Sequence, residues 1–255
     1  MLYIEQFVYT NKMREVHSLE KLGFALLTMI ICLASSDRLV IPLLTTLIMS
    51  CLLVAKARIP LRVLLKLFSI PLGFLLISAI TIALTISKQP EDLTSFIRLG
   101  DFYLGFTTEG LRLAIQTTSV SLGAVSCLYF LALTTPTTEL LYSLRLIKLP
   151  SLLIELMTLI YRFIFLFLET ALQIYTAQSS RWGYSNMRRS FTSLGLLLAN
   201  VWGKAYFKSR QLYTGMLSRG YENELKLLNP KMNFSARTLF LFVTTDLLLL
   251  ILAII

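Results

Sequence analysis

Charged residues are scarce in this sequence of 255 residues. They make up 15% of the chain against 56% for hydrophobic residues, and the mean hydropathy is +0.72. Soluble domains carry about a quarter charged residues, so this composition excludes a domain surrounded by water. The first twenty residues mix both charge signs and lack an apolar run before a cleavage site, which argues against a removed signal peptide. We expect an integral membrane protein.

The residue types that most often carry catalysis or bind transition metals are also rare. His17 is the only histidine, and no GxxxxGK[ST] nucleotide loop is present. A histidine-based triad or metal cluster is therefore excluded. We expect a chain that is not an enzyme and holds no cofactor and no metal, so that energy for transport comes from another subunit. Three cysteines lie in apolar runs without a metal or redox spacing: Cys32, Cys51 and Cys127.

Five apolar runs are candidates to cross a bilayer core roughly 30 Å thick. The first two are short and indicate a tight helical hairpin, and the fourth is rich in small residues that permit close helix packing. The fifth contains Asp246, a candidate functional group because a carboxylate is costly in lipid, although Thr244 and Thr245 beside it could satisfy it. The runs are Leu22–Ala34, Leu39–Ala55, Leu64–Ile86, Leu113–Leu133 and Leu239–Ile255.

The distribution of positive charge predicts the orientation of these spans. Loops rich in Lys and Arg remain in the cytoplasm. The loop after the second run has four basic residues and no acidic one, whereas the loop after the third has three basic and four acidic residues. The stretch 134–237 has thirteen basic and five acidic residues. We therefore expect a cytoplasmic N-terminus, a cytoplasmic segment after the fourth span, and no nucleic-acid binding behind the net charge of +10.

The cytoplasmic segment is predicted to form three helices. The first begins at Thr135–Pro136 and stops before Pro150. The second runs from Ser151 to Ser180, and its nearly apolar first half leaves a sixth span open as an alternative. Against a sixth span, the Arg-rich remainder would then lie outside. A polar line also runs down this helix: Glu155, Arg162 and Glu169.

The third helix, Met187 to Arg219, is amphipathic in its second half. We expect its apolar face to meet the membrane or the other helices, and its basic face to meet the cytosol or a protein. The basic face carries Lys204, Lys208, Gln211, Gly215 and Arg219, and the opposite face carries Trp202, Tyr206, Tyr213 and Leu217.

Both long helices end in an arginine followed by a glycine. Gly183 follows Arg181 after one residue, and Gly220 follows Arg219 directly. Glycine suits the left-handed residue that ends a helix, and arginine suits the negative end of the helix dipole, so each pair has a purely structural interpretation. The alternative is that both guanidinium groups dock on soluble partner subunits, because arginine offers a rigid fork to carboxylates and carbonyls.

The stretches LALTTPTTELLYSLRLIKLPSLLIELMTLIYRFIFLFLETA, SRWGYSN and YTGMLSRGY resemble the transmembrane T-component of energy-coupling factor (ECF) transporters, in particular the CbiQ type for cobalt and nickel uptake. The resemblance is strong from about Phe106 to Leu228 and faint before it. It implies two long crossed coupling helices whose tips dock into two ABC-type ATPase subunits, beside a membrane subunit that captures the substrate.

Carried over to this chain, the resemblance implies one docking motif at Arg181 with Gly183 and a second at Ser218-Arg219-Gly220. The family pattern has alanine before the arginine, where this chain has serine, and often glycine directly after it. Trp182 separates Arg181 from its glycine and makes the first motif the more divergent one.

The expected fold is an all-α integral membrane protein with about five transmembrane helices and a cytoplasmic domain of two long crossed amphipathic coupling helices and one shorter helix. Its parts are a membrane region at 1–133 with a polar N-terminal tail, a coupling domain at 134–234 and a terminal span at 235–255. The expected function is a non-catalytic coupling subunit of a cell-membrane importer for cobalt or nickel. The alternatives are a T-component for a vitamin such as biotin, a self-contained permease, and a membrane-bound enzyme, which the lack of a catalytic cluster disfavours.

Overall fold

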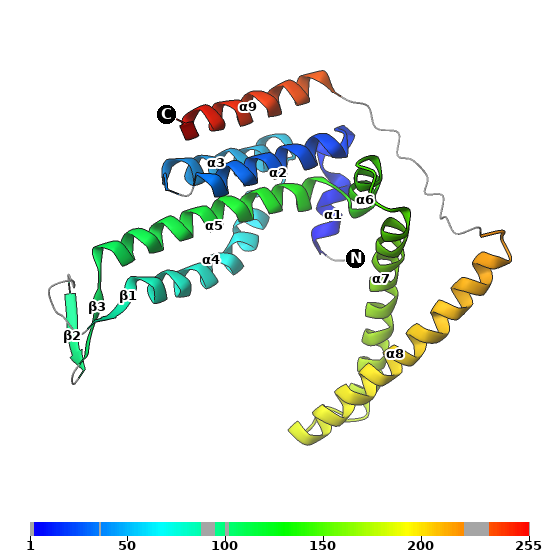
Figure 1. The fold of residues 1–255 in the computed structure, drawn as a ribbon. Helices are drawn as coiled ribbons and strands as arrows, with labels where there is room; N and C mark the ends of the chain where they lie inside the picture. The colour runs from blue at the N-terminus through cyan, green and yellow to red at the C-terminus, as the bar shows by residue number, and fades with distance from the viewer. Residues whose placement is uncertain (1–2, 36, 88–94, 100–101, 222–234, 255) are drawn as a thin grey trace. The chain divides into compact units, whose positions relative to one another are not determined.

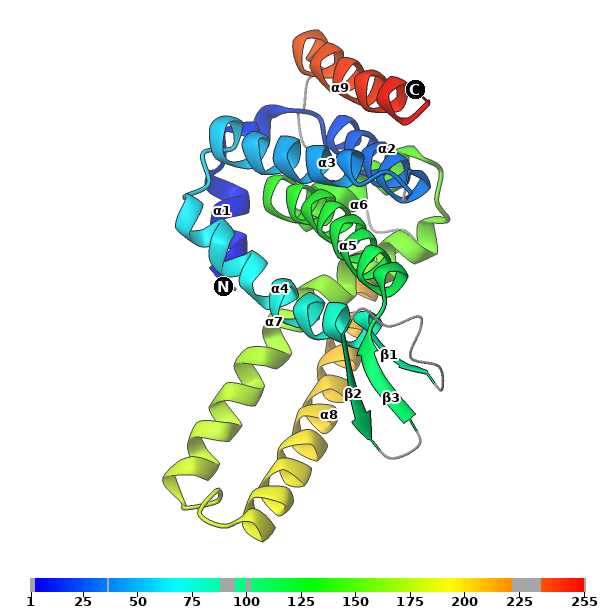
Figure 2. The same ribbon diagram turned by 90° about the vertical axis from the view of Figure 1, so that its left-hand side faces the viewer.

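The computed structural model describes residues 3–35, 37–87, 95–99, 102–221 and 235–254. The chain forms two compact units, which change over after Pro136 and again after Pro230. One consists of Leu2–Pro136 and Lys231–Ile255, and we call it the membrane unit. The other spans Thr137–Pro230, and we call it the helical-arm unit. Figures 1 and 2 show the elements of each.

The membrane unit is built mainly from helices that pack around α5. Its α5 helix contacts α1, α2, α3 and α4, while α9 packs against α2 and α3. A π-helical turn, η2, continues α3, and Pro71 lies within an uninterrupted α4. The bounds are α1 Tyr3–Thr10, η1 Lys12–Glu15, α2 Ser18–Ala34, α3 Val40–Cys51, η2 Leu52–Lys56, α4 Leu61–Ala83, α5 Thr108–Thr134 and α9 Ala236–Ile254.

Four described helices are long and apolar enough to cross a membrane: α4, α5, α9 and, in the helical-arm unit, α7. The helix pair α2 and α3 occupies the predicted hairpin, but α2 has 17 residues and the apolar segment Val40–Lys56 is also short. These helices make the chain a multi-pass membrane protein. Which helices form the five expected spans stays a prediction, and α7 keeps the sixth-span alternative open.

A small antiparallel sheet follows α4, where the sequence predicted helix to Ile86 and then a loop. Its strands are β1 Leu84–Ser87, β2 Ser95–Leu99 and β3 Phe102–Phe106, in the order β1-β3-β2. Phe106 of the central strand β3 pairs with Leu84 of β1 on one side and with Ser95 of β2 on the other. The sheet therefore ends α4 three residues early, because its first strand takes residues 84–87.

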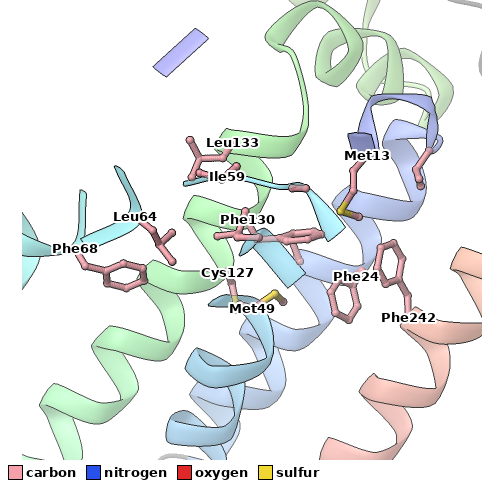
Figure 3. Packing of buried hydrophobic residues seen from close by; sticks show 14 residues of the cluster. Met13, Phe24, Met49, Ile59, Leu64, Phe68, Cys127, Phe130, Leu133 and Phe242 are labelled. Atoms are coloured by element: carbon pink, nitrogen blue, oxygen red, sulfur yellow. The ribbon is translucent and has the colours of Figure 1, made fainter. Parts of the chain in front are cut away.

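The core of the membrane unit lies between α2, α3, α4, α5 and α9, and a group of phenylalanine rings fills the part between α2, α5 and α9 (Figure 3). Phe24 stacks on Phe242 with ring centroids 4.2 Å apart, and Phe130 meets Phe24 edge-on at 5.5 Å. A close backbone approach lies nearby, since a Cβ on Gly123 would come within 2.5 Å of Cys32 Sγ and 2.8 Å of Thr45 Oγ1. This contact confirms the prediction that small residues in the fourth span allow close packing.

The described residues from Asn11 to Lys21 pack against this core. Met13 and Val16 are buried in it. Asn11 donates to the carbonyl of Leu133 at 2.9 Å, and the fully buried Lys21 donates from Nζ to that of Thr134 at 3.1 Å. The last carbonyls of a helix lack partners within it and carry partial negative charge. Asn11 and Lys21 therefore fix the end of α5, just before the helical-arm unit begins.

Four hydrogen bonds, made by Glu20, Thr28 and Arg38, hold α9 along α2 and the turn after it. Glu20 accepts hydrogen bonds from the amide of Ser235 at 3.2 Å and the hydroxyl of Thr238 at 2.9 Å, at the start of α9. Thr28 donates to Asp246 at 2.8 Å near its middle. Arg38 donates to the carbonyl of Leu252 at 3.0 Å near its end.

The helical-arm unit contains α6 Thr137–Leu146, α7 Ser151–Ser180 and α8 Met187–Leu217. Pro150 precedes α7 with extended backbone, and the turn 181–186 joins α7 to α8 (Figure 2). The second predicted helix is thus confirmed from Ser151 to Ser180, and the third ends two residues early. Most of the apolar side chains on both arms are exposed.

Candidate functional site: two arginine-bearing helix ends

The end of α7 is closed by two backbone hydrogen bonds. Trp182 donates its N–H to the carbonyl of Ser179 at 3.1 Å, and Gly183 donates to that of Gln178 at 2.9 Å. Trp182 has a φ of +58°, in the left-handed region. This combination is the Schellman motif, which satisfies carbonyls left unpaired at a helix end.

The end of α8 repeats the same pattern with different residues. Gly220 donates to the carbonyl of Leu217 at 3.1 Å, and Tyr221 donates to that of Met216 at 3.1 Å. Gly220 carries the positive φ of +76°. Arg181 and Arg219 therefore occupy the same position, the residue directly before the left-handed one, in two helix ends of equal geometry. We call Arg181–Gly183 the first tip and Ser218–Gly220 the second tip.

The first tip departs from the sequence interpretation of its glycine. The left-handed residue there is Trp182, so Gly183 is not the residue that needs this freedom. Gly183 is required by crowding instead, because a Cβ would lie 2.8 Å from the carbonyl oxygen of Gln178 and 2.9 Å from Ser193 Oγ. At the second tip a Cβ on Gly220 would meet nothing within 4 Å, so there the positive φ alone favours glycine.

Side chains fix the first tip to the start of α8. Gln178 donates from Nε2 to the carbonyl of Ser193 at 3.0 Å and accepts from the hydroxyl of Tyr184 at 2.8 Å. Ser193 donates back to the carbonyl of Gly183 at 2.8 Å. The turn is therefore held from both helices, which gives Arg181 a fixed origin.

Both arginines are exposed, and their guanidinium groups make no hydrogen bond or ion pair with any residue that the structure describes. Trp182 beside Arg181 is 76% exposed. An exposed tryptophan and an unpaired arginine are the side chains most often enriched where proteins bind each other. The arrangement suits binding to a partner that supplies carboxylates or carbonyls.

Two cavities open beside the second tip, one of about 430 Å³ along α8 and one of about 630 Å³. The larger one lies between α7 and α8 and is mixed in character, with three basic side chains and one acidic. Its lining includes Arg162, Phe165 and Glu169 from α7 and Lys208, Gln211 and Arg219 from α8.

Both faces of the amphipathic half of α8 are exposed. Lys208, Gln211 and Arg219 of the basic face line the cavity toward α7 and remain exposed, so the expectation that this face meets the cytosol or a protein stays a prediction. On the apolar face Trp202 is 79% exposed and Tyr206 is 59% exposed. An exposed aromatic face of this kind marks a surface for lipid or another protein.

Three buried hydroxyls of the membrane unit bond to the backbone of their own helix. Thr28, Thr45 and Ser126 are fully buried, and each donates a hydrogen bond to a carbonyl of its own helix. Asp246 is held by Thr28 and not by its neighbours Thr244 and Thr245, whose hydroxyls bond to backbone carbonyls. Nor do the described residues include a group of three His, Cys, Asp or Glu side chains that could hold a metal ion.

Comparison with known families matches residues 10–228 to the family described as CbiQ, cobalt transport protein. A relative named cobalt transport protein CbiQ, from Rhodobacter capsulatus, is 30% identical over 74% of this chain and 72% of its own length. Its namesake in Salmonella typhimurium is 32% identical over 62% of this chain and 71% of its own.

Two archaeal relatives match nearly the whole chain. An uncharacterized protein of Methanocaldococcus jannaschii is 33% identical over 98% of this chain and 92% of its own length. A putative fused cobalt transport protein CbiMQ of Methanocorpusculum labreanum is 32% identical over 94% of this chain and 40% of its own length. The similarity therefore includes the first hundred residues, where the sequence interpretation found it faint.

Proposed function

Because this chain belongs to the CbiQ cobalt transport protein family, a family of membrane transport components, we propose that it is the coupling subunit of an ECF-type importer. In this proposal two ABC-type ATPase subunits bind the tips of α7 and α8, and a separate membrane subunit captures the metal. The chain itself passes movement from one to the other. It supplies no catalytic group of its own.

The observation that carries the proposal is the repeated geometry of the two tips. Arg181 and Arg219 stand at equivalent positions of two Schellman motifs, exposed and unpaired within the described part of the chain. A helix cap alone does not need an arginine at that position, since the backbone bonds already satisfy the last carbonyls. Two equal sites suit a pair of equal partners, such as the two ATPase subunits of one transporter.

The arms also have the shape that transmission of movement needs. A helix rises 1.5 Å per residue, so α7 and α8, with 30 and 31 residues, are each about 45 Å long. Closure of the ATPase pair on binding ATP would displace both tips, and the long helices would carry that displacement to their far ends. Sliding of packed helices is a recognised form of such a change.

The exposed apolar faces of the arms are the proposed seat of the substrate subunit. Leu152, Ile160 and Leu172 on α7 and Trp202 and Tyr206 on α8 are more than half exposed. Apolar surface of this extent is costly in water, so a membrane subunit or lipid is expected to cover it. This chain matches 40% of the length of the relative named as a putative fused cobalt transport protein CbiMQ. That relative therefore carries a further segment in the same polypeptide, which supports a second subunit beside this chain.

Cobalt is the proposed cargo, since the family is described as a cobalt transport protein family. Nickel has the same charge and stays within the proposal, while a vitamin such as biotin finds no support in the names of the relatives. The proposal also includes the cell membrane as location, a cytoplasmic N-terminus and a cytoplasmic domain at 134–234. Several buried hydroxyls of the membrane unit bond to the backbone of their own helix, which does not favour the permease alternative.

The test is co-purification of the candidate ATPase subunits with wild type and with Arg181→Glu, Arg219→Glu and the double variant. Charge reversal at an exposed tip changes no contact inside the described chain, so folding is expected to survive. We expect each single variant to weaken ATPase binding about tenfold or more, because a lost charge-assisted hydrogen bond is worth roughly 1.5–3 kcal/mol, and the double variant to abolish it.

Lys204→Glu is the matched control, since Lys204 lies on α8 about four turns before the second tip and is also exposed. It is expected to retain the ATPase subunits. If both tip variants bind the ATPase as wild type does, the tips are structural caps and the docking proposal is wrong. A gel-filtration profile for each variant separates lost docking from lost folding.

A further inference from the structure

Tyr221 links the second tip to α7. It follows Gly220 directly, and its backbone N–H completes the Schellman motif of α8. Its hydroxyl donates a short hydrogen bond to Oε1 of Glu155 on the second turn of α7, 66 residues earlier. The tip is thereby fixed twice, by its backbone to α8 and by this side chain to α7.

The side chain of Glu155 is buried, with 8% exposed, whereas Glu169 further along α7 is exposed. A buried carboxylate is costly unless it is hydrogen-bonded, so the bond from Tyr221 has a clear energetic role. The same bond raises the pKa of Tyr221 above its usual value, as expected for a hydroxyl that donates to a carboxylate.

Apolar packing does not fix the second tip in its place. The cavity of about 630 Å³ separates the middle of α7 from the last turns of α8, and Arg219 itself lines it. At the first tip, by contrast, Gln178, Tyr184 and Ser193 form a network across the turn. The two arms are thus joined by polar contacts at both ends with a hollow between them.

From this arrangement we infer that the Tyr221–Glu155 hydrogen bond is a positioning contact that makes α7 and the second tip move together. The inference rests on the proposed function. When an ATPase subunit displaces the second tip, the bond transmits that displacement to the start of α7, next to the loop from α6. Without it, the end of α8 can swing into the cavity, and the same ATPase movement is lost there.

The variant that tests this inference is Tyr221→Phe, which removes one hydroxyl and keeps the ring. The purified transporter, with its ATPase and substrate subunits, is reconstituted in vesicles, and cobalt uptake and ATP hydrolysis are measured together. We expect cobalt taken up per ATP hydrolysed to fall about tenfold, the effect of one lost hydrogen bond to a charged group. Co-purification of the ATPase is expected to be unchanged, because neither arginine is altered.

Two further variants separate positioning from general damage. Glu155→Gln keeps an acceptor for the hydroxyl of Tyr221 and is expected to retain most of the coupling, whereas Glu155→Leu loses it. Tyr213→Phe removes the hydroxyl of an exposed tyrosine on the same helix and is expected to behave as wild type. Equal loss in Glu155→Gln and Glu155→Leu would contradict the inference.

A distance measurement tests the geometry without any ATPase. Spin labels are placed at Leu152→Cys on α7 and Leu217→Cys on α8, with the exposed native Cys51 replaced by alanine. Wild type is expected to give one narrow distance distribution and Tyr221→Phe a broad one. An unchanged distribution overturns the positioning role, and a broad distribution with unchanged coupling overturns its part in transport. If wild type binds no ATPase at all, the proposed function fails, while this measurement still decides the role of Tyr221.

Discussion

Trp182 and Gly220 occupy the same position in two helix ends, with φ values of +58° and +76°. One is the bulkiest residue and the other the smallest, yet both follow an arginine and both adopt the left-handed conformation. This conformation costs a residue with a Cβ roughly 1–2 kcal/mol. The first tip therefore carries a backbone strain that the second tip avoids.

We predict that Trp182→Gly stabilises the helical arms. It removes the left-handed cost, and the entropy lost by a glycine on folding, roughly 0.5–1 kcal/mol, offsets only part of the gain. Because Trp182 is mostly exposed, little packing is lost. The net gain of up to about 1 kcal/mol is expected to raise the Tm in detergent by a few degrees.

The matched variant is Gly220→Ala, which introduces a Cβ at the same position of the second tip. Its Cβ meets no atom within 4 Å, so any loss of Tm reports the backbone conformation alone. A Tm for Trp182→Gly below that of wild type would show that the contacts of Trp182 stabilise the arms by more than its left-handed backbone conformation destabilises them.

A second prediction concerns the attachment of α9. Glu20→Ala removes the acceptor for both Ser235 and Thr238 at the start of that helix. Leaving these donors unpaired in a partly buried site is expected to cost about 1–3 kcal/mol. The variant should have a lower Tm and faster proteolysis near residue 235, measured by limited proteolysis in detergent.

Glu20→Gln is the control for this prediction, since its amide retains one accepting oxygen. We expect its Tm to lie between those of wild type and Glu20→Ala. Equal Tm values for all three proteins would mean that the contacts of Phe242, Asp246 and Leu252 hold α9 in place without Glu20.

The third prediction is a pH dependence that comes from His17. This residue is 4% exposed, and its Nδ1 accepts a hydrogen bond from the N–H of Leu19 at the start of α2. Burial lowers the pKa of His17, with nearby Lys21 acting in the same direction and Glu20 against it. The folded state therefore favours the neutral ring.

The sign of the effect follows from this lowered pKa. As pH falls below about 6.5, the usual value for histidine, the unfolded chain binds a proton before the folded one does. Stability is thus complete above that pH and declines below it. We expect a lower Tm at pH 5.5 than at pH 7.5, and a smaller difference in His17→Asn, which keeps a capping acceptor but does not titrate there. An equal difference in both proteins would assign the effect to other groups.

Local signals in the sequence were enough to predict the long helices of the arms. Pro150 separates α7 from the helix before it, and the Arg-Trp-Gly stretch ends α7. The bounds Ser151–Ser180 could therefore be predicted from the sequence. The similarity to the cobalt transport family also rested on these stretches and is confirmed by the comparisons.

Features that depend on distant residues were not predictable in this way. No residue near Trp182 in the sequence indicates its positive φ. Glycine is necessary one residue later, at Gly183, because Ser193 of α8 occupies the space that a Cβ would need. Likewise, the buried positions of Met13 and His17 depend on packing in the membrane unit. Periodicity separates the two faces of α8, but it does not say that Lys208 lines a cavity toward α7, because that depends on a neighbouring helix. Glu222 and Glu224 follow the second tip, where the sequence allows either a contact with a partner or a cap of the turn, and they lie outside the described residues.

The contacts of α9 with Glu20, Thr28 and Arg38 have a consequence for biosynthesis. A ribosome that has translated residue 221 has already completed both arms with their arginine tips, but the membrane unit still lacks the helix that covers Phe24. Chains fold as they are made, from the N-terminal side. During this interval the unpaired Glu20 carboxylate and the open aromatic surface must be protected by lipid or by the insertion machinery, and the arrival of α9 closes the membrane unit last.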